Sequence, residues 1–312
     1  MAQIISGIAM SHSPFIMTNK EAGGVKGQMF LDKAEEMQKW IKSESPDVIV
    51  LISDDHFNSY FYNHMPSFTI GIGECEGWGD WKIPKYKIPV EKELANHILT
   101  KGLSQGVDFA FTMSMKVDHG HTQAIYLLNS DLDIPIVPIA VNTSAPPLPT
   151  MERCFQVGEI IQNAIESWED GTKKVAIIAS GGLSHWVPTP KVDSKKPEDQ
   201  NMINILVHGH SVIENPEEYK KNKEERVTKI TEGPVNESWD REFLEAIIAG
   251  NHDTLKNWSY ESIEKSGGNG GQEIHNWLVL LGILKNFKAQ TVYYEPIPEW
   301  VTGMAIVQFS KN

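Results

Sequence analysis

The chain has 312 residues, 40% of them hydrophobic and 22% charged, which is the composition of a globular protein large enough for one α/β domain or two smaller ones. Lys and Arg number 28 against 41 Asp and Glu, and the formal net charge of -13 argues against nucleic acid or an anionic membrane surface as a partner. Only three of the basic residues are arginines (Arg153, Arg226 and Arg241), so a substrate carboxylate would have few possible bidentate partners.

The two cysteines, Cys75 and Cys154, are too few for a disulfide framework and have no CxxC spacing, so a reducing compartment is expected. Residues 1–20 lack the basic and apolar regions of a signal peptide, and no stretch approaches the ~20 apolar residues of a membrane span. We therefore expect a soluble cytoplasmic protein without a membrane partner.

Short β-branched runs alternate with longer helical patterns, which favours βαβ units. The predicted strands are Ile4 to Met10, Val48 to Ser53, Phe68 to Ile72, Ile134 to Val141, Lys174 to Ser180 and Met304 to Phe309. The predicted helices are Met29 to Ser43, Lys92 to Gln105, Thr122 to Leu128, Met151 to Trp168, Trp239 to Ala249 and Gln272 to Lys285. The pattern predicts an α/β fold in a single domain, residues 1–312, whose central sheet is mostly parallel or mixed and is flanked by helices.

The segment Thr189 to Pro234 interrupts this alternation with runs of mixed charge. Such runs are typical of solvated helical faces, so we predict a charged helical insertion at the surface, residues 189–234. The more specific alternative is that this segment forms a lid over the active site. The segment leaves directly from the strand end that precedes His185, so it should border the mouth of the site.

Three side chains of metal-ligand type stand where a predicted element begins or ends. His12 follows the first strand and precedes Pro14, His56 follows the second, and Glu273 begins a helix after a glycine-rich loop. Each alone has a plainer explanation, such as a loop hydrogen bond for a histidine or the helix dipole for the glutamate. Together, two imidazoles and one carboxylate suit a non-heme Fe(II) site with open coordination positions.

Other polar residues flank these candidates. Asp54 and Asp55 are either acceptors that fix the ring of His56 or simple turn residues. His119 and His185 adjoin glycine-containing turns and can transfer protons near neutral pH. Ser184 invites a serine-hydrolase interpretation, but its surroundings lack the Gly-x-Ser-x-Gly elbow.

Six motifs, taken in order, resemble those of the type III extradiol ring-cleaving dioxygenases, the protocatechuate 4,5-dioxygenase beta-subunit superfamily. They are Ser11-His12-Ser13-Pro14, Asp54-Asp55-His56, Val117-Asp118-His119-Gly120-His121-Thr122, Gly181-Gly182-Leu183-Ser184-His185, Asn236-Glu237-Ser238-Trp239-Asp240 and Gly268-Asn269-Gly270-Gly271-Gln272-Glu273. The similarity runs from about residue 5 to about Phe309. The long segment between His185 and Asn236 looks more like the 2,3-dihydroxyphenylpropionate branch than the compact protocatechuate branch.

The resemblance implies that His12, His56 and Glu273 bind Fe(II) and that His119 and His185 are the acid-base pair beside the substrate. It also implies cleavage by O2 of a catechol-type ring next to its ortho hydroxyls, and assembly into a homo-oligomer. His185 is expected to be the base or hydrogen-bond donor, and His119 to position the ring or return a proton.

Three alternatives stay open at this point. The family includes enzymes that act on 2-aminophenols, so the motifs leave the ring itself undefined. Imidazole and carboxylate also suit zinc, which allows a zinc-dependent hydrolase or a zinc-bearing relative that acts on a catechol amine. A non-catalytic binding protein would have no need of the acid-base pair.

Overall fold

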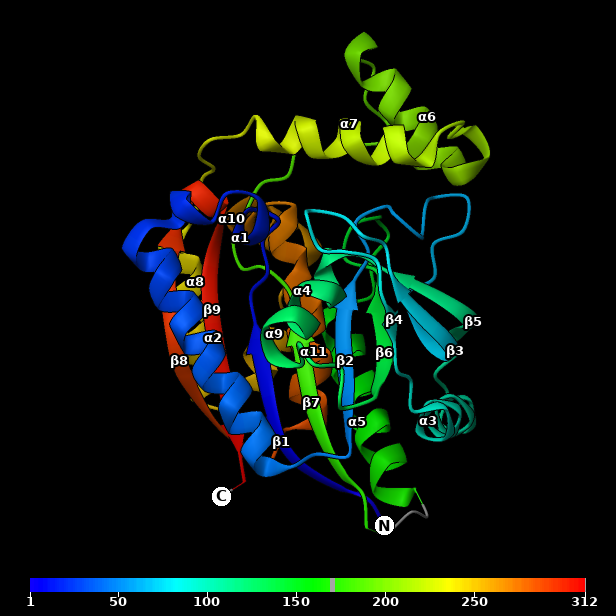
Figure 1. The fold of residues 1–312 in the computed structure, drawn as a ribbon, viewed down its shortest axis with the longest axis vertical. Helices are drawn as coiled ribbons and strands as arrows, with labels where there is room; N and C mark the ends of the chain where they lie inside the picture. Colours follow the sequence, from blue (N-terminus) through cyan, green and yellow to red (C-terminus); the bar gives the residue numbers. More distant parts are fainter. Residues whose placement is uncertain (169–171, 312) are drawn as a thin grey trace.

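The computed structural model describes residues 1–168 and 172–311, and its centre is a mixed nine-stranded sheet (Figure 1). The strand order is β4-β3-β6-β2-β7-β1-β9-β8, and β5 pairs with β3. The strands are β1 (Gln3–Met10), β2 (Val48–Asp54), β3 (Phe68–Gly77), β4 (Lys87–Ile88), β5 (Ala110–Val117), β6 (Ile136–Val141), β7 (Lys174–Ser180), β8 (Lys288–Ile297) and β9 (Thr302–Ser310).

The central strands β6, β2, β7 and β1 run parallel to one another. Every residue of β2 and β6 is buried, and both strands are nearly continuous runs of apolar residues. Such runs are typical of parallel strands that helices cover on both faces. Antiparallel pairing begins where β9 joins β1 on one side and β3 joins β6 on the other, which makes the sheet mixed.

Helices cover both faces of this sheet (Figure 1). One face packs against α2 (Gly24–Glu44) and α4 (His119–Leu128). The other face is covered by α3 (Lys92–Ser104), α5 (Met151–Ser167), α8 (Glu237–Ile248) and α11 (Ile274–Ile283). The remaining α-helices of the described residues are α1 (Phe15–Thr18), α6 (Gln200–His208), α7 (Pro216–Thr228), α9 (His252–Lys256) and α10 (Tyr260–Gly267). The predicted α/β class, with a mixed sheet flanked by helices, is confirmed.

Each predicted strand and helix is present, with ends that differ by a few residues. The β6 strand begins at Ile136 rather than Ile134, and α11 begins at Ile274, after a 3-10 turn (Gly270–Glu273). Strands β4, β5 and β8 were not predicted. Half-exposed β8 and edge strand β5 lack a continuous apolar run, and β5 exposes Phe111 and Met113 to solvent.

Helices α6 and α7 form most of the regular structure between residues 189 and 234. Figure 1 shows them above the edge of the sheet at which β2 ends, with α7 lying across the top of the molecule. Tyr219 of α7 is buried and donates a hydrogen bond from its hydroxyl to the Phe57 carbonyl oxygen at 3.1 Å. None of the described helices combines the length and apolar character needed to cross a membrane.

Candidate active site

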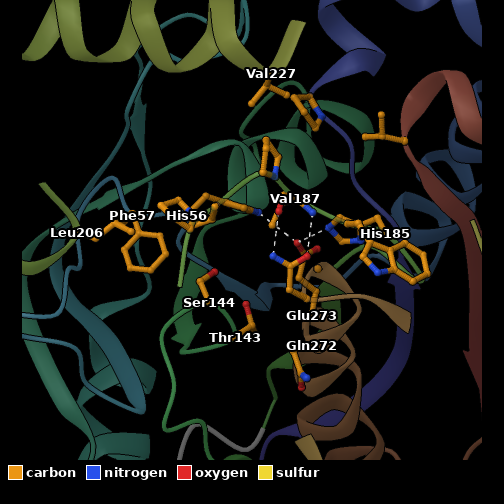
Figure 2. A pocket seen from close by; sticks show the side chains of 18 of the residues that line it. His56, Phe57, Thr143, Ser144, His185, Val187, Leu206, Val227, Gln272 and Glu273 are labelled. Carbon is orange, nitrogen blue, oxygen red and sulfur yellow. Dashed lines mark hydrogen bonds and ion pairs between the residues drawn. The ribbon is translucent and has the colours of Figure 1, made fainter. Parts of the chain in front are cut away.

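Strand order places the candidate residues at one edge of the sheet. Strands β2, β7 and β1 are neighbours and parallel, so their carboxyl ends meet at the same edge, where open α/β sheets hold their sites. His56, His185 and His12 follow these three strands. Glu273 reaches the same place from the 3-10 turn that precedes α11, and Figure 2 shows His56, His185 and Glu273 converging.

The three candidate ligands face one another closely. Nε2 of His12 lies 3.4 Å from Nε2 of His56 and 3.2 Å from Oε2 of Glu273, and Nε2 of His56 lies 3.3 Å from Oε1 of Glu273. Nitrogen and oxygen ligands bound about 2.1 Å from one ion, at right or tetrahedral angles, would lie about 3.0–3.4 Å apart. The spacing of these three atoms therefore fits a single metal ion.

Hydrogen bonds behind the ligands fix their orientation. Nδ1 of His56 donates to Oδ2 of Asp118 at 3.1 Å, and Nδ1 of His12 faces Oγ of Ser180 at 3.0 Å. The backbone N–H of Gly182 donates to Oε2 of Glu273 at 2.5 Å. Both imidazoles thus turn Nε2 toward the carboxylate, as metal-bound histidines with acceptors on their far nitrogens do.

The charges around these residues favour a cation between them. Burial lowers the pKa of His12 to about 3, so its ring is neutral. Burial alone would also lower the pKa of His56, but Asp54 and Asp118 outweigh it and hold that pKa well above its usual range. Burial would raise the pKa of Glu273, yet His12 and His185 hold it well below its usual value. An ionised carboxylate beside a neutral imidazole lone pair is a donor set that suits a divalent metal.

His119 lies directly beside this set. Its ring stacks on that of His56 with centroids 4.1 Å apart, and its Nδ1 donates to Oδ2 of Asp80 at 2.9 Å. Asp118 caps α4 by accepting from the N–H of Gly120, which fixes the backbone at His119. The other nitrogen of the His119 ring, Nε2, is therefore available to form a hydrogen bond with a molecule bound in the site.

His185 also faces Glu273. Its Nε2 lies 3.1 Å from Oε1 of Glu273, and its Nδ1 donates to the Leu183 carbonyl oxygen at 2.8 Å. The glycine-rich loop is needed here, because a Cβ on Gly270 would lie 2.1 Å from the His185 ring, and one on Gly268 would lie 2.1 Å from the His185 carbonyl oxygen. Gly268 also has a φ of +82°, which favours glycine.

All five predicted residues line one cavity of about 720 Å³, part of which is drawn in Figure 2. Phe57 and Leu206 lie on one side of it, and Thr143 and Ser144 lie near its base. Helix α7 crosses above, with Val227 directed toward the cavity. A site of this size and apolar lining can hold a substituted aromatic ring.

The structure also assigns the acidic residues whose roles the sequence left open. Asp55 accepts from the backbone N–H groups of Asn58, Ser59 and Tyr60, which makes it a turn residue. Asp54 lies 3.5 Å from Nε2 of His56, on the ligand side of the ring.

Asp118 holds Nδ1 of His56 and Asp80 holds Nδ1 of His119, and neither role was predicted. The position of Asp118 beside His119 was a usable signal for the first. No pattern marks the second, because Asp80 stands in a loop distant in the sequence.

The chain matches the family model described as the catalytic LigB subunit of aromatic ring-opening dioxygenase over residues 6–305. Relatives named 2,3-dihydroxyphenylpropionate/2,3-dihydroxicinnamic acid 1,2-dioxygenase include proteins of the following bacteria. The protein of Photorhabdus laumondii is 34% identical, with 90% of this chain and 88% of the relative covered. That of Rhodococcus jostii is 31% identical, with 95% of each chain covered. That of Escherichia coli (strain K12 / DH10B) is 30% identical, with 94% and 95% covered.

One solved structure, an uncharacterized protein of Escherichia coli K12, aligns with a TM-score of 0.49 at 14% identity and covers 97% of this chain and 99% of that chain. The family match spans nearly the whole chain and includes every residue of the site described above. The chain therefore belongs to the LigB family and is an extradiol ring-cleaving dioxygenase that acts on catechol-type aromatic compounds.

Proposed function

We propose that the protein is an Fe(II)-dependent extradiol dioxygenase in which His12, His56 and Glu273 bind the metal. The observation that carries the proposal is the convergence of two imidazole Nε2 atoms and one carboxylate, 3.2–3.4 Å apart, with outer hydrogen bonds that point them inward. Members of this family depend on a metal, and this group of the chain can hold one. Two histidines and one carboxylate with open positions are typical of Fe(II) oxygenases.

When bound, Fe(II) would hold the diol and O2 together and relay electrons between them. Both oxygen atoms enter the ring-opened product, so the reaction needs no further reductant. The protein's own residues handle protons. A catechol must lose hydroxyl protons to bind well, and a histidine placed to take them contributes roughly 10²–10⁴-fold in rate.

His185 and His119 are the two groups for this proton transfer. We assign His185 as the base or hydrogen-bond donor beside the metal, because its Nε2 lies 3.1 Å from Oε1 of Glu273 and its ring lines the cavity. His119 stacks on the ring of His56, with its Nδ1 held by Asp80, and would position the ring or return the proton to the ring-opened product. Trp81 contacts the His119 ring edge to face at 5.7 Å and supports its orientation.

For the substrate, we propose a catechol with an acidic side chain, of the dihydroxyphenyl-acid class. The relatives named above, at 30–34% identity over most of the chain, carry names with 2,3-dihydroxyphenylpropionate. The cavity has the volume and the apolar walls for a ring with a side chain. No feature of the described residues favours a 2-aminophenol over a diol.

Anaerobic reconstitution with Fe(II) or Zn(II) tests the proposal. Fe(II) should restore oxygen uptake and yellow ring-opened product from a panel of catechol, protocatechuate, gallate, 2-aminophenol and 2,3-dihydroxyphenylpropionate, with the last preferred. Variants His12→Ala, His56→Ala and Glu273→Ala should retain the fold and lose most bound iron, whereas His64→Ala, an exposed histidine, should keep it.

Several outcomes would overturn the assignment. Activity with Zn(II) but not Fe(II), or product without oxygen uptake, would identify a zinc enzyme. Undiminished iron in Glu273→Ala would show that the carboxylate ligand is another residue.

The cytoplasmic location and the homo-oligomer stay predictions. Cys75 and Cys154 are both buried free thiols, which agrees with a reducing compartment. Assembly rests on the family resemblance, and sedimentation equilibrium of the purified protein would measure it.

A further inference from the structure

Helix α7 is fastened to the active site through one face. The Lys223 ammonium donates to the His56 carbonyl oxygen and, at 2.9 Å, to Oδ1 of Asn58. Glu224 accepts from the backbone N–H of Trp81 at 2.8 Å. Because these contacts reach the residues around His56 and His119, the helix forms part of the site.

Arg226 stands on the same face of α7 as Lys223. Residues three apart on a helix have Cβ atoms roughly 5–6 Å apart, so Arg226 lies one turn along from the group that holds His56. Its side chain lines the cavity and is partly buried. Nε of Arg226 is buried without a hydrogen-bond partner. Among the described residues, Arg241 is the arginine that forms an ion pair, and no carboxylate pairs with Arg226. A buried N–H without an acceptor is unfavourable, and a carboxylate bound in the cavity could supply one to this partly buried guanidinium.

The other Lys and Arg side chains of the described residues already have partners or lie outside the cavity. Lys191 lines the cavity but pairs with Glu264 at 2.9 Å. Lys223 donates its hydrogen bonds to the loop that follows β2. Of the other arginines, half-buried Arg153 donates to the Gly106 carbonyl oxygen and exposed Arg241 pairs with Glu237. Among the described residues, Arg226 is thus the one arginine in the cavity, and its planar fork suits a carboxylate.

We propose that Arg226 binds the carboxylate of the substrate's side chain and thereby selects acidic catechols. The inference rests on the proposed function, because it takes the diol to be bound at His12, His56 and Glu273. Val227 and Ile230, beside Arg226 in the cavity wall, would pack on the aliphatic part of that side chain. Asp193 and Glu264 also line the cavity, and Lys191 lies near both carboxylates and pairs with Glu264 at 2.9 Å.

The test compares an acid with its neutral counterpart on Fe(II)-loaded enzyme. We would measure kcat/KM for 2,3-dihydroxyphenylpropionate and for its primary amide. In Arg226→Gln, the ratio of acid to amide should fall roughly 10- to 100-fold, as expected for loss of a charge-assisted hydrogen bond. Arg226→Lys keeps the charge without the fork and should give an intermediate ratio. Lys221→Gln removes an exposed charge from the same helix and should leave the ratio unchanged.

A second readout does not depend on the metal or on turnover. Phenylpropionate lacks the hydroxyls that bind iron, so its affinity measured by calorimetry reports the carboxylate site. Arg226→Gln should weaken this affinity about tenfold or more, and Lys221→Gln should not.

Equal losses for acid and amide, or unchanged phenylpropionate binding in Arg226→Gln, would refute the role of Arg226 while leaving the proposed function intact. If the wild-type enzyme cleaves neither compound, the proposed function fails and this inference fails with it.

Discussion

At the scale of single residues, the ligand atoms depend on acceptors that stand behind them. Oδ2 of Asp118 accepts from Nδ1 and the backbone N–H of His56, and from Nδ2 of Asn58 at 2.8 Å. Burial would raise the pKa of Asp118, but His56 and His119 hold it well below its usual value, so the carboxylate is ionised. A charged acceptor fixes the His56 tautomer and increases the basicity of its Nε2.

Replacing Asp118 by Asn should therefore weaken Fe(II) affinity roughly 10- to 100-fold, because outer acceptors of metal-bound histidines contribute about that much. Competition with a chelator under anaerobic conditions would measure the change. Asp55→Asn is the matched control, since Asp55 is a buried acid that binds backbone N–H groups and no imidazole. Equal loss of affinity in both variants would mean that general charge, rather than the His56 contact, is responsible.

His185 should act on turnover and leave metal binding intact. If it transfers protons, His185→Ala should keep near-normal iron and substrate binding and lose roughly 10²–10⁴-fold in kcat, about 2.7–5.4 kcal/mol at ~1.36 kcal/mol per decade. A substrate with a more acidic hydroxyl should lose less, because it depends less on a base. Loss of iron in step with activity would instead make His185 a ligand, and metal analysis of the same preparation distinguishes the two results.

The sequence pointed to His12 and His56 as candidate site residues because the ends of apolar strands can be recognised in it. His12 and His56 follow apolar β-branched runs, and strand ends of a parallel sheet meet at one edge. Asp80 and Lys223 could not be predicted as partners of the site, because their positions depend on how long loops and α7 fold back over the sheet edge. Pairing between distant loops leaves no periodicity for a pattern to reveal.

At the scale of elements, α7 combines an exposed charged face with a face fastened to the site. The composition of α7 predicts only a solvated helix. The buried contacts of Tyr219 and Lys223 could not be predicted, because one aromatic and one basic residue do not make an amphipathic pattern. Strand β5 was missed for a similar reason, since its side chains alternate irregularly between exposure and burial. The continuous runs of β2 and β7 were predicted almost residue by residue.

We expect limited proteolysis to cut first in the segment 189–234, and a bound catechol acid to slow the cut. Residues 191–199, which precede α6, are mostly exposed, whereas α7 lines the cavity and would gain contacts from a ligand. Lys223→Ala should speed the cleavage by releasing α7 from the loop after β2, and Lys221→Ala should not. The same cleavage rate with and without ligand would leave the segment as a surface insertion without a lid function.

At the scale of the whole molecule, the site concentrates acidic groups inside a protein that already carries a net charge of -13. Burial raises the pKa of Asp54 to about 7, with a further contribution from Glu273, and the cluster also contains Asp118. A divalent cation bound among them would relieve this repulsion in the folded state, while the unfolded chain offers no such site. Metal binding should therefore stabilise the entire fold.

The consequence is a melting temperature that rises with Fe(II) concentration under anaerobic conditions. A ligand at 100 times its Kd adds about 2.7 kcal/mol to the free energy of unfolding, which corresponds to a few degrees for a chain of this size. Glu273→Ala should lose most of this shift because it removes the anionic ligand, and His64→Ala should retain it. Calorimetry of the three proteins with and without metal measures the effect. An equal shift in melting temperature in wild type and Glu273→Ala would mean that the stabilising ion binds elsewhere, because an ion stabilises the fold only through a site that still binds it.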